Sequence, residues 1–180
     1  MVDSDLEKYS KKAIEAGVTT VKQISPDTVV TAEWVRMKCL FGCPFQGYSY
    51  TCPPHTPTPE ETRTMISDYS RALLFHTRSP YTEDRDKNDK RVSSTLVTME
   101  GEMFKNGLYK AFLYKHGPCF VCKMCKKTTG EPCVAVDKKR PSMESAGIDV
   151  YQTARNNSLS IESLYDVTDT QNLFALMLVD

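Results

Sequence analysis

The sequence predicts a mixed α+β fold, in which a small sheet is flanked by helices and cysteine-rich loops gather at one end. Strand-like and helix-like segments follow in the order strand, loop, helix, strand, which is typical of a mixed sheet covered by helices. The chain has 180 residues and a hydrophobic content of 40%, enough for one ordinary core. We therefore expect a single domain over residues 1–180.

The first expected elements are a helix and a strand. Ser4 and Glu7 form a capping-box pattern that predicts a helix, and Gly17 is its natural stop. Residues 18–24 are rich in β-branched side chains, which predicts a strand. Residues 28–37 give no clear signal.

A proline-rich stretch precedes the second expected helix. The proline-rich stretch 53–59 predicts an extended connector. Thr58 and Glu61 flank a proline and predict a second helix start, because threonine caps, proline suits the first position and glutamate closes the capping box. That helix is expected to end near residue 69. The apolar run 71–76 then predicts a buried strand.

The second half of the chain contains two expected helices and a terminal strand. The densely charged residues 81–91 predict a solvated loop. Apolar residues at helical spacing predict a long helix over 92–116, and a capping box predicts a short helix over 149–156. The apolar stretch 172–179 is too short to span a membrane and predicts a buried strand.

Composition restricts the function classes. Basic and acidic residues both count 23, so the net charge is zero, and we expect no general attraction to nucleic acid or to a membrane. The sequence shows no long apolar run and no signal-peptide pattern at its start, so we expect a cytoplasmic protein. It contains seven cysteines, and clustered cysteines in a reducing compartment indicate metal or redox chemistry rather than disulfides.

The second cysteine group, in the segment 119–140, has the spacing of a metal site, Cys-x2-Cys-x2-Cys-x7-Cys. Three thiolates on one tight loop with a distal fourth can surround a 4Fe-4S cluster, as in bacterial ferredoxins. The pattern departs from ferredoxin because Pro132 precedes the last cysteine instead of following it. Structural zinc normally uses two separate Cys-x2-Cys pairs. A third cysteine in a row fits this arrangement poorly, so zinc is the alternative and not the first choice. The predicted ligands are Cys119, Cys122, Cys125 and Cys133.

Basic residues concentrate in the same segment. Six basic residues face only two acidic ones between positions 119 and 140. Positive charge offsets the negative charge of a thiolate-ligated cluster and favours its reduced state. We expect the same residues to contact an acidic redox partner protein, although a solvated loop explains them equally well. They are Lys123, Lys126, Lys127, Lys138, Lys139 and Arg140.

The first cysteine group, in the segment 39–55, is less regular: Cys-x3-Cys-x8-Cys-Pro-Pro. Its glycines and prolines predict a loop that could fold around a metal. Three cysteines leave one coordination position open, for which His55 is a candidate. Three interpretations stay open: a second cluster with an open iron, thiols that exchange with a nearby cluster, or structural core cysteines. We favour metal binding by Cys39, Cys43 and Cys52.

Several motifs together resemble a known family. They are WVRMKC-x3-C, YTCPPHTPTPEET, GPC-x2-C-x2-C with EPC, and RPSMESAGIDV. This combination, from about Trp34 to the terminal strand, resembles a family of predicted metal-binding proteins of unknown function from anaerobic bacteria and archaea. The resemblance implies that both cysteine groups and residues 140–149 belong to the family pattern. It also implies oxygen-sensitive iron-sulfur clusters and an anaerobic lifestyle.

The role of residues 140–149 is open at this stage. The segment follows Cys133 closely, so its backbone could pack against a cluster, or Arg140 and Glu144 could line a cleft. Capping and turn formation explain the segment equally well. The sequence contains no phosphate loop, dinucleotide fingerprint, HExxH motif or convincing serine-histidine-acid set.

The main functional prediction is an iron-sulfur electron carrier or redox module. It would bind at least one 4Fe-4S cluster, with a second cluster as a further possibility. One alternative is a redox enzyme that uses an open-site cluster or reactive thiols for reduction or sulfur chemistry. Another is a zinc-stabilised binding protein.

Overall fold

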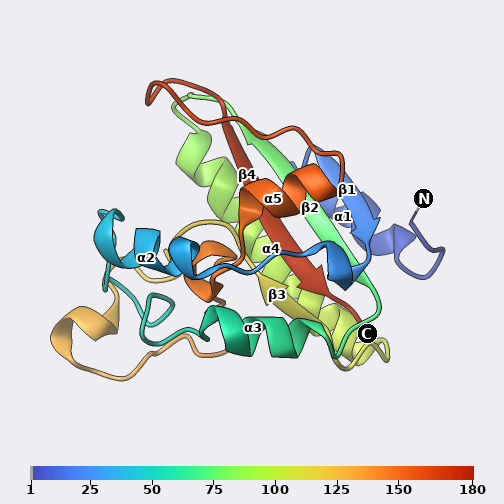
Figure 1. Cartoon of the computed structure of the whole chain (residues 1–180), viewed down its shortest axis with the longest axis horizontal. Coiled ribbons are helices and arrows are strands. Elements are labelled where there is room, and N and C mark those ends of the chain that lie inside the picture. Colours follow the sequence, from blue (N-terminus) through green and yellow to red (C-terminus); the bar gives the residue numbers. More distant parts are fainter. Residues whose placement is uncertain (1) are drawn as a thin grey trace.

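Four strands form one antiparallel sheet in the computed structural model, which describes residues 2–180 (Figure 1). The strand order is β1-β2-β4-β3, and each neighbouring pair is antiparallel. The mixed α+β class is thus confirmed, whereas the expectation of a mixed sheet was wrong. The strands are β1 (Thr20–Ile24), β2 (Ala72–Ser79), β3 (Phe112–Tyr114) and β4 (Gln171–Leu178).

Both faces of the sheet are buried. Leu73 pairs with Met177 and contributes to one apolar cluster, while its neighbour Leu74 pairs with Leu176 and contributes to another. Successive residues of a strand point to opposite faces, so a strand covered on both sides is apolar at nearly every position. This explains why β2 and β4 have continuous apolar sequences without alternation.

Helices cover both faces of the sheet (Figure 1). α1 (Glu7–Glu15) and α4 (Arg85–Lys105) supply the helical side chains of one apolar cluster. α3 (Pro59–Ile66) and α5 (Val150–Asn156) supply those of the other. α2 (Glu33–Phe41) lies at the end of the molecule where the cysteine loops gather. Among the described residues, no helix is both long and apolar enough to cross a membrane.

Two of the three expected helix caps are present. The Thr58 hydroxyl accepts a hydrogen bond from the Glu61 N–H at 3.2 Å, and the Thr58 N–H donates to the Glu61 carboxylate at 2.7 Å. Asp149 caps α5 by accepting from the Gln152 N–H at 2.9 Å. The third expected cap, the capping box of Ser4 and Glu7, was wrong. α1 starts after Leu6, which makes no side-chain capping hydrogen bond.

The largest error of the sequence prediction concerns residues 81–116. The expected charged loop contains the first two turns of α4, because its charged side chains form the exposed face of the helix. The helix ends at Lys105, and residues 112–114 form β3 instead of continuing it. These residues extend the sheet because they pair with β4.

Two further segments differ from expectation. Residues 28–37, which gave no clear signal, contain the last residue of a 3-10 turn (Pro26–Thr28) and the start of α2. The proline-rich stretch is not extended throughout, since residues 53–56 form turns and bends before the straight entry into α3. The strands expected at 18–24, 71–76 and 172–179 are confirmed as β1, β2 and β4.

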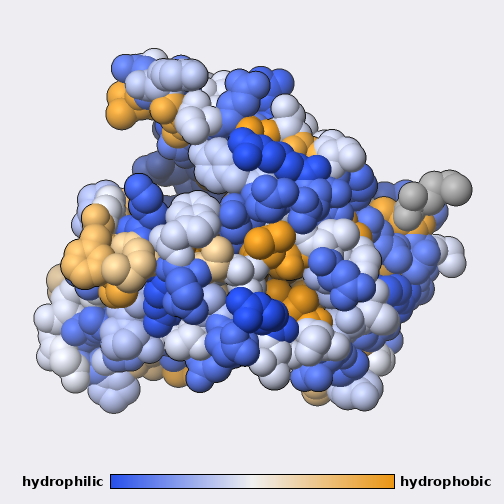
Figure 2. Space-filling view, viewed as in Figure 1, coloured by the Kyte–Doolittle hydropathy of each residue, from blue (hydrophilic) through white to orange (hydrophobic). Residues whose placement is uncertain are grey.

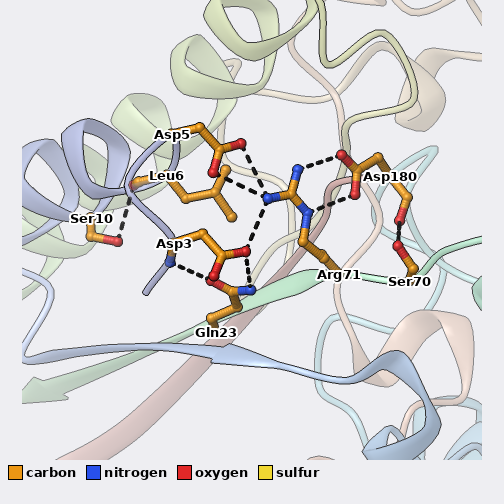
Figure 3. Close-up of polar contacts among 8 residues, drawn as sticks. All are labelled: Asp3, Asp5, Leu6, Ser10, Gln23, Ser70, Arg71 and Asp180. Atoms are coloured by element: carbon orange, nitrogen blue, oxygen red, sulfur yellow. Dashed lines mark hydrogen bonds and ion pairs between the residues drawn. The ribbon is translucent and has the colours of Figure 1, made fainter. Parts of the chain in front are cut away.

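Arg71 joins residues from distant parts of the chain next to the sheet (Figure 3). Its guanidinium donates to the carboxylates of Asp180, at 2.9 and 2.5 Å, and to those of Asp3 and Asp5, each at 3.1 Å. The hydrogen bond from this guanidinium holds the pKa of Asp180 below its ordinary value. The contact ties the segment before α1 to the segment after β4.

Candidate metal centre

The four cysteines of the second group line one pocket. Cys119, Cys122, Cys125 and Cys133 share it with residues 49–51, which belong to the first cysteine segment. The pocket has an empty volume of about 320 Å³, part of it open to solvent. All four thiols are free and partly exposed. The structure therefore brings together the complete ligand set that the spacing predicts.

The loop around these cysteines is shaped by local backbone bonds. Cys125 precedes a 3-10 turn over residues 126–129, and its carbonyl accepts from both the Thr128 N–H and the Thr128 hydroxyl, at 3.1 and 2.7 Å. Gly130 ends the turn with a φ of +74°, which favours glycine. This turn reverses the chain and leads it back toward Cys133.

The four thiols line the pocket, but they do not converge on one position that a metal ion could occupy. Within residues 2–180, no three His, Cys, Asp or Glu side chains lie close enough together to hold a metal ion as they stand. Metal binding at either cysteine group therefore requires its side chains to turn toward a common point. The donor set itself suits soft transition metals, because four cysteine thiolates are the usual ligands of iron-sulfur clusters and of many zinc sites.

Polar contacts attach the two cysteine segments to each other. The Tyr50 hydroxyl donates to the Glu131 carbonyl at 2.7 Å, and the Lys127 ammonium donates to the Gly47 carbonyl at 2.7 Å. The Lys139 ammonium lies 5.7 Å from the centre of the Tyr50 ring, within the range of a cation–π contact. The loops that carry the two groups thus lie side by side next to α2 (Figure 1).

Aromatic side chains add an apolar contact between the same loops. Phe120 of the second segment packs edge-on against Phe45 of the first, with ring centroids 5.5 Å apart. Tyr48 lies 6.4 Å from each of these two rings. Such edge-to-face pairs are favourable beyond their buried area. The three rings support the relative position of the two cysteine segments.

The first cysteine group is distributed over a helix and a turn. Cys39 lies in the last turn of α2, so only Cys43 and Cys52 occupy the expected loop. Cys52 is buried, and its sulfur lies 3.4 Å from the Ser49 hydroxyl. The His55 ring is exposed and packs edge-on against Tyr50. The ring of His55 thus interacts with an aromatic neighbour of the same cysteine segment.

Negative charge accumulates around Cys39. Burial raises the pKa of its thiol to about 11, and the negative charges of Glu144, Cys43 and Cys52 raise it further, while Arg36 opposes them. Glu144, Cys43 and Cys52 therefore lie near enough to Cys39 to influence the ionisation of its thiol. A bound cation would relieve this repulsion and favour the thiolate.

The segment 140–149 pairs with Lys115, the residue that follows β3. The Pro141 carbonyl accepts from the Lys115 N–H at 2.9 Å, and the Met143 N–H donates to the Lys115 carbonyl at 3.0 Å. The Arg140 guanidinium donates to the buried Glu100 carboxylate at 2.6 Å. Arg140 thus has an internal partner and anchors the segment to α4.

Two buried ionisable side chains lie along this segment. The Lys115 ammonium donates to the Pro118 carbonyl at 3.0 Å; burial lowers its pKa, while nearby Cys119 and Glu144 oppose the change. Burial raises the pKa of Glu144, and its Oε2 atom is buried without a hydrogen-bond partner among the described residues. Such an atom is unusual, since buried polar atoms are normally paired.

Sequence reasoning missed two buried charges next to the site, Glu100 and Lys115. Lys115 lies near the carboxyl end of the helix that was expected over 92–116, where a lysine is ordinary. Glu100 could have been found, because it lies four positions after Leu96 on the apolar face of α4, where a carboxylate requires a buried partner.

The basic residues expected to contact a partner differ in their surroundings. Lys123 and Lys138 are exposed. Lys126 forms an ion pair with Glu131 at 3.1 Å. The remaining three make contacts within the chain, and they are Lys127, Lys139 and Arg140.

This fold and site define a cysteine-rich α+β protein with a candidate metal centre built from two adjoining cysteine segments. Residues 22–179 match the family described as predicted metal-binding protein (DUF2284). The chain belongs to this family. Searches of curated proteins and of solved structures found no match.

Proposed function

We propose that the protein is an iron-sulfur redox protein in which Cys119, Cys122, Cys125 and Cys133 hold a 4Fe-4S cluster. The observation that carries the proposal is that all four thiols line one pocket. When bound, the cluster would accept and release single electrons. Membership of a metal-binding family supports a metal at these cysteines.

The spacing favours a cluster over a single zinc ion. Three cysteines at intervals of three on one loop, followed by a distal fourth, correspond to the ferredoxin arrangement better than to paired zinc knuckles.

The surroundings of the pocket favour an electron carrier that meets a protein partner. Lys123 and Lys138 are exposed on the same loop. Apolar side chains are also exposed at this end of the molecule, among them Met37 and Phe41 of α2, at 52% and 79%, and Figure 2 shows apolar atoms over this end. A basic and apolar surface beside a redox centre suits an acidic partner protein.

Replacing one predicted ligand tests the proposal. In protein purified without oxygen, we expect iron and sulfide in equal amounts and visible absorption that bleaches on reduction. Cys122→Ser should remove the iron and absorption of this cluster, because a cluster that loses one of its thiolate ligands is destabilised. Met124→Ser is the matched control, since Met124 is an exposed residue of the same loop and should leave both unchanged.

Other results would contradict the proposal. Stoichiometric zinc without sulfide would identify the protein as a zinc-stabilised binding protein instead. Full retention of the cluster in Cys122→Ser would show that the ligands lie elsewhere. A change in the electron paramagnetic resonance spectrum on addition of a candidate small ligand would favour a redox enzyme with an open iron over a plain carrier.

A further inference from the structure

The first cysteine group lacks a fourth ligand in the sequence, and the structure offers one from outside that segment. Glu144 begins the short 3-10 helix η3 (Glu144–Ala146), far along the chain from Cys39. Its Oε2 atom is buried, and no hydrogen bond or ion pair within residues 2–180 engages it. Leaving a buried carboxylate oxygen unpaired is costly, so the structure should compensate for it.

The packing of α2 places this carboxylate next to the first group. The Arg36 guanidinium of α2 donates to the Ser145 carbonyl at 2.9 Å, which fixes α2 against η3. Cys39 lies three positions after Arg36, and residues at this spacing share one face of a helix. Cys39 is therefore on the side of α2 that faces η3.

The charges around the site are consistent with this placement. Glu144 is, after burial, the strongest influence on the pKa of Cys39, ahead of Cys43 and Cys52. Lys115 also lies near Glu144, but its ammonium is directed to the Pro118 carbonyl and the Ser93 hydroxyl. Lys115 thus leaves the Oε2 atom of Glu144 without a direct partner.

We propose that Glu144 is the fourth ligand of a metal site formed with Cys39, Cys43 and Cys52. The site would hold either a single Zn²⁺ ion through three thiolates and one carboxylate, or a 4Fe-4S cluster in which the three thiolates bind three of the irons and the carboxylate binds the fourth. The inference deepens the proposed function by assigning a ligand set to the first group, and it rests on that group binding metal. A carboxylate also explains why the motif contains only three cysteines.

Metal analysis of the complete chain tests the proposal. Iron, sulfide and zinc per chain are measured after anaerobic purification of the wild type and of Glu144→Gln, Cys39→Ser and Glu33→Gln. Glu33 is the matched control, because it is an exposed acid on the helix that carries Cys39. We expect Glu144→Gln and Cys39→Ser to lose the same increment of metal, with an affinity lowered at least about tenfold, and Glu33→Gln to lose none. The metal that is lost, zinc or iron with sulfide, distinguishes the single ion from the cluster.

A second measurement does not depend on the folding of the Glu144 variant. X-ray absorption of Cys122→Ser, which lacks the cluster of the second group, should detect oxygen as well as sulfur around the remaining metal. Sulfur alone, or unchanged metal content in folded Glu144→Gln, would overturn the proposal. If Cys39→Ser loses no metal while Cys122→Ser loses the cluster, this inference fails and the proposed function stands. If only Cys39→Ser loses metal, the assignment of the second group fails instead.

Discussion

Several ionisable side chains near the cysteines are buried, and their protonation states follow from that burial. The pKa values of Lys115, Glu144 and His116 are all shifted in the direction that favours the neutral side chain, and burial is the largest cause of each shift. His116 is the clearest case: burial, together with the charge of Lys115, lowers its pKa to about 4. The side chain is therefore neutral in the folded protein at pH 7.

This lowered pKa predicts a loss of stability in mild acid. Unfolded His116 takes up a proton near pH 6.5, whereas the folded protein takes it up only near pH 4. The unfolded state thus binds more protons between these values, and the free energy of unfolding should fall by up to about 3 kcal/mol as pH decreases through this window. Chemical denaturation of the wild type at pH 7 and pH 4.5 would measure the fall.

Variants isolate the contribution of His116. His116→Asn should make the fall clearly smaller, while His55→Asn should not, because His55 is exposed. Comparison of the two variants cancels every pH effect that does not involve the substituted histidine. An equal pH dependence in the two variants would contradict the assignment to His116.

Residue identity and spacing revealed part of the candidate site. The spacing of the second cysteine group is local in sequence, so its four members could be recognised without a structure. The buried surroundings of Lys115 and Glu144 depend on how residues 140–149 pack against Lys115 and α2, and no local pattern carries that information. The closeness of Glu144 to Cys39 likewise arises only from the packing of α2 against η3.

At the scale of elements, the site depends on how closely η3 approaches the start of α3. Gly147 ends η3 with a φ of +78°, a conformation that favours glycine. A Cβ atom at this position would lie 2.4 Å from the Cγ atom of Pro59 and 3.1 Å from its Cα atom. Since Pro59 is the first residue of α3, only a glycine allows the two elements to pack this closely.

Gly147→Ala should therefore destabilise the protein strongly. We expect a loss of roughly 2–4 kcal/mol from the combination of backbone strain and steric overlap with Pro59. Gly130→Ala is the matched control, because Gly130 has a similar φ of +74° but open space around the position of a Cβ, and it should cost about 1 kcal/mol. Urea denaturation measures both. Equal losses would show that the contact with Pro59 relaxes without cost.

Elements with strong local signals were predicted well, and elements set by tertiary contacts were not. The capping residues of α3 and the apolar runs of β2 and β4 carry their own information. The end of α4 could not be located, because the apolar residues of 108–113 suit helical spacing as well as a strand. Only pairing with β4 makes residues 112–114 a strand.

At the scale of the whole molecule, charge and exposed apolar surface are unevenly distributed although the net charge is zero. The segment 119–140 carries six basic and two acidic residues. It lies at the same end of the molecule as α2 (Figure 1), which carries exposed apolar side chains. Such an uneven surface can guide a partner to one end of a neutral protein.

Charge reversal tests this guidance. Replacing both Lys123 and Lys138 with glutamate should slow electron transfer from an acidic ferredoxin by about tenfold or more at low salt, and the difference should shrink as salt is added, because salt screens exposed charges. Lys105→Glu, at the end of α4, is the control. Stopped-flow absorption measures the rates, and unchanged rates at low salt would rule out docking through these lysines.

The strand at the centre of the sheet is also the last strand in the sequence. β4 pairs with both β2 and β3, so the sheet cannot close until residues 171–178 have been synthesised. Pairing between segments so far apart in the chain slows folding. Both cysteine segments leave the ribosome earlier than β4, so both proposed metal sites are synthesised while the surrounding fold is still open.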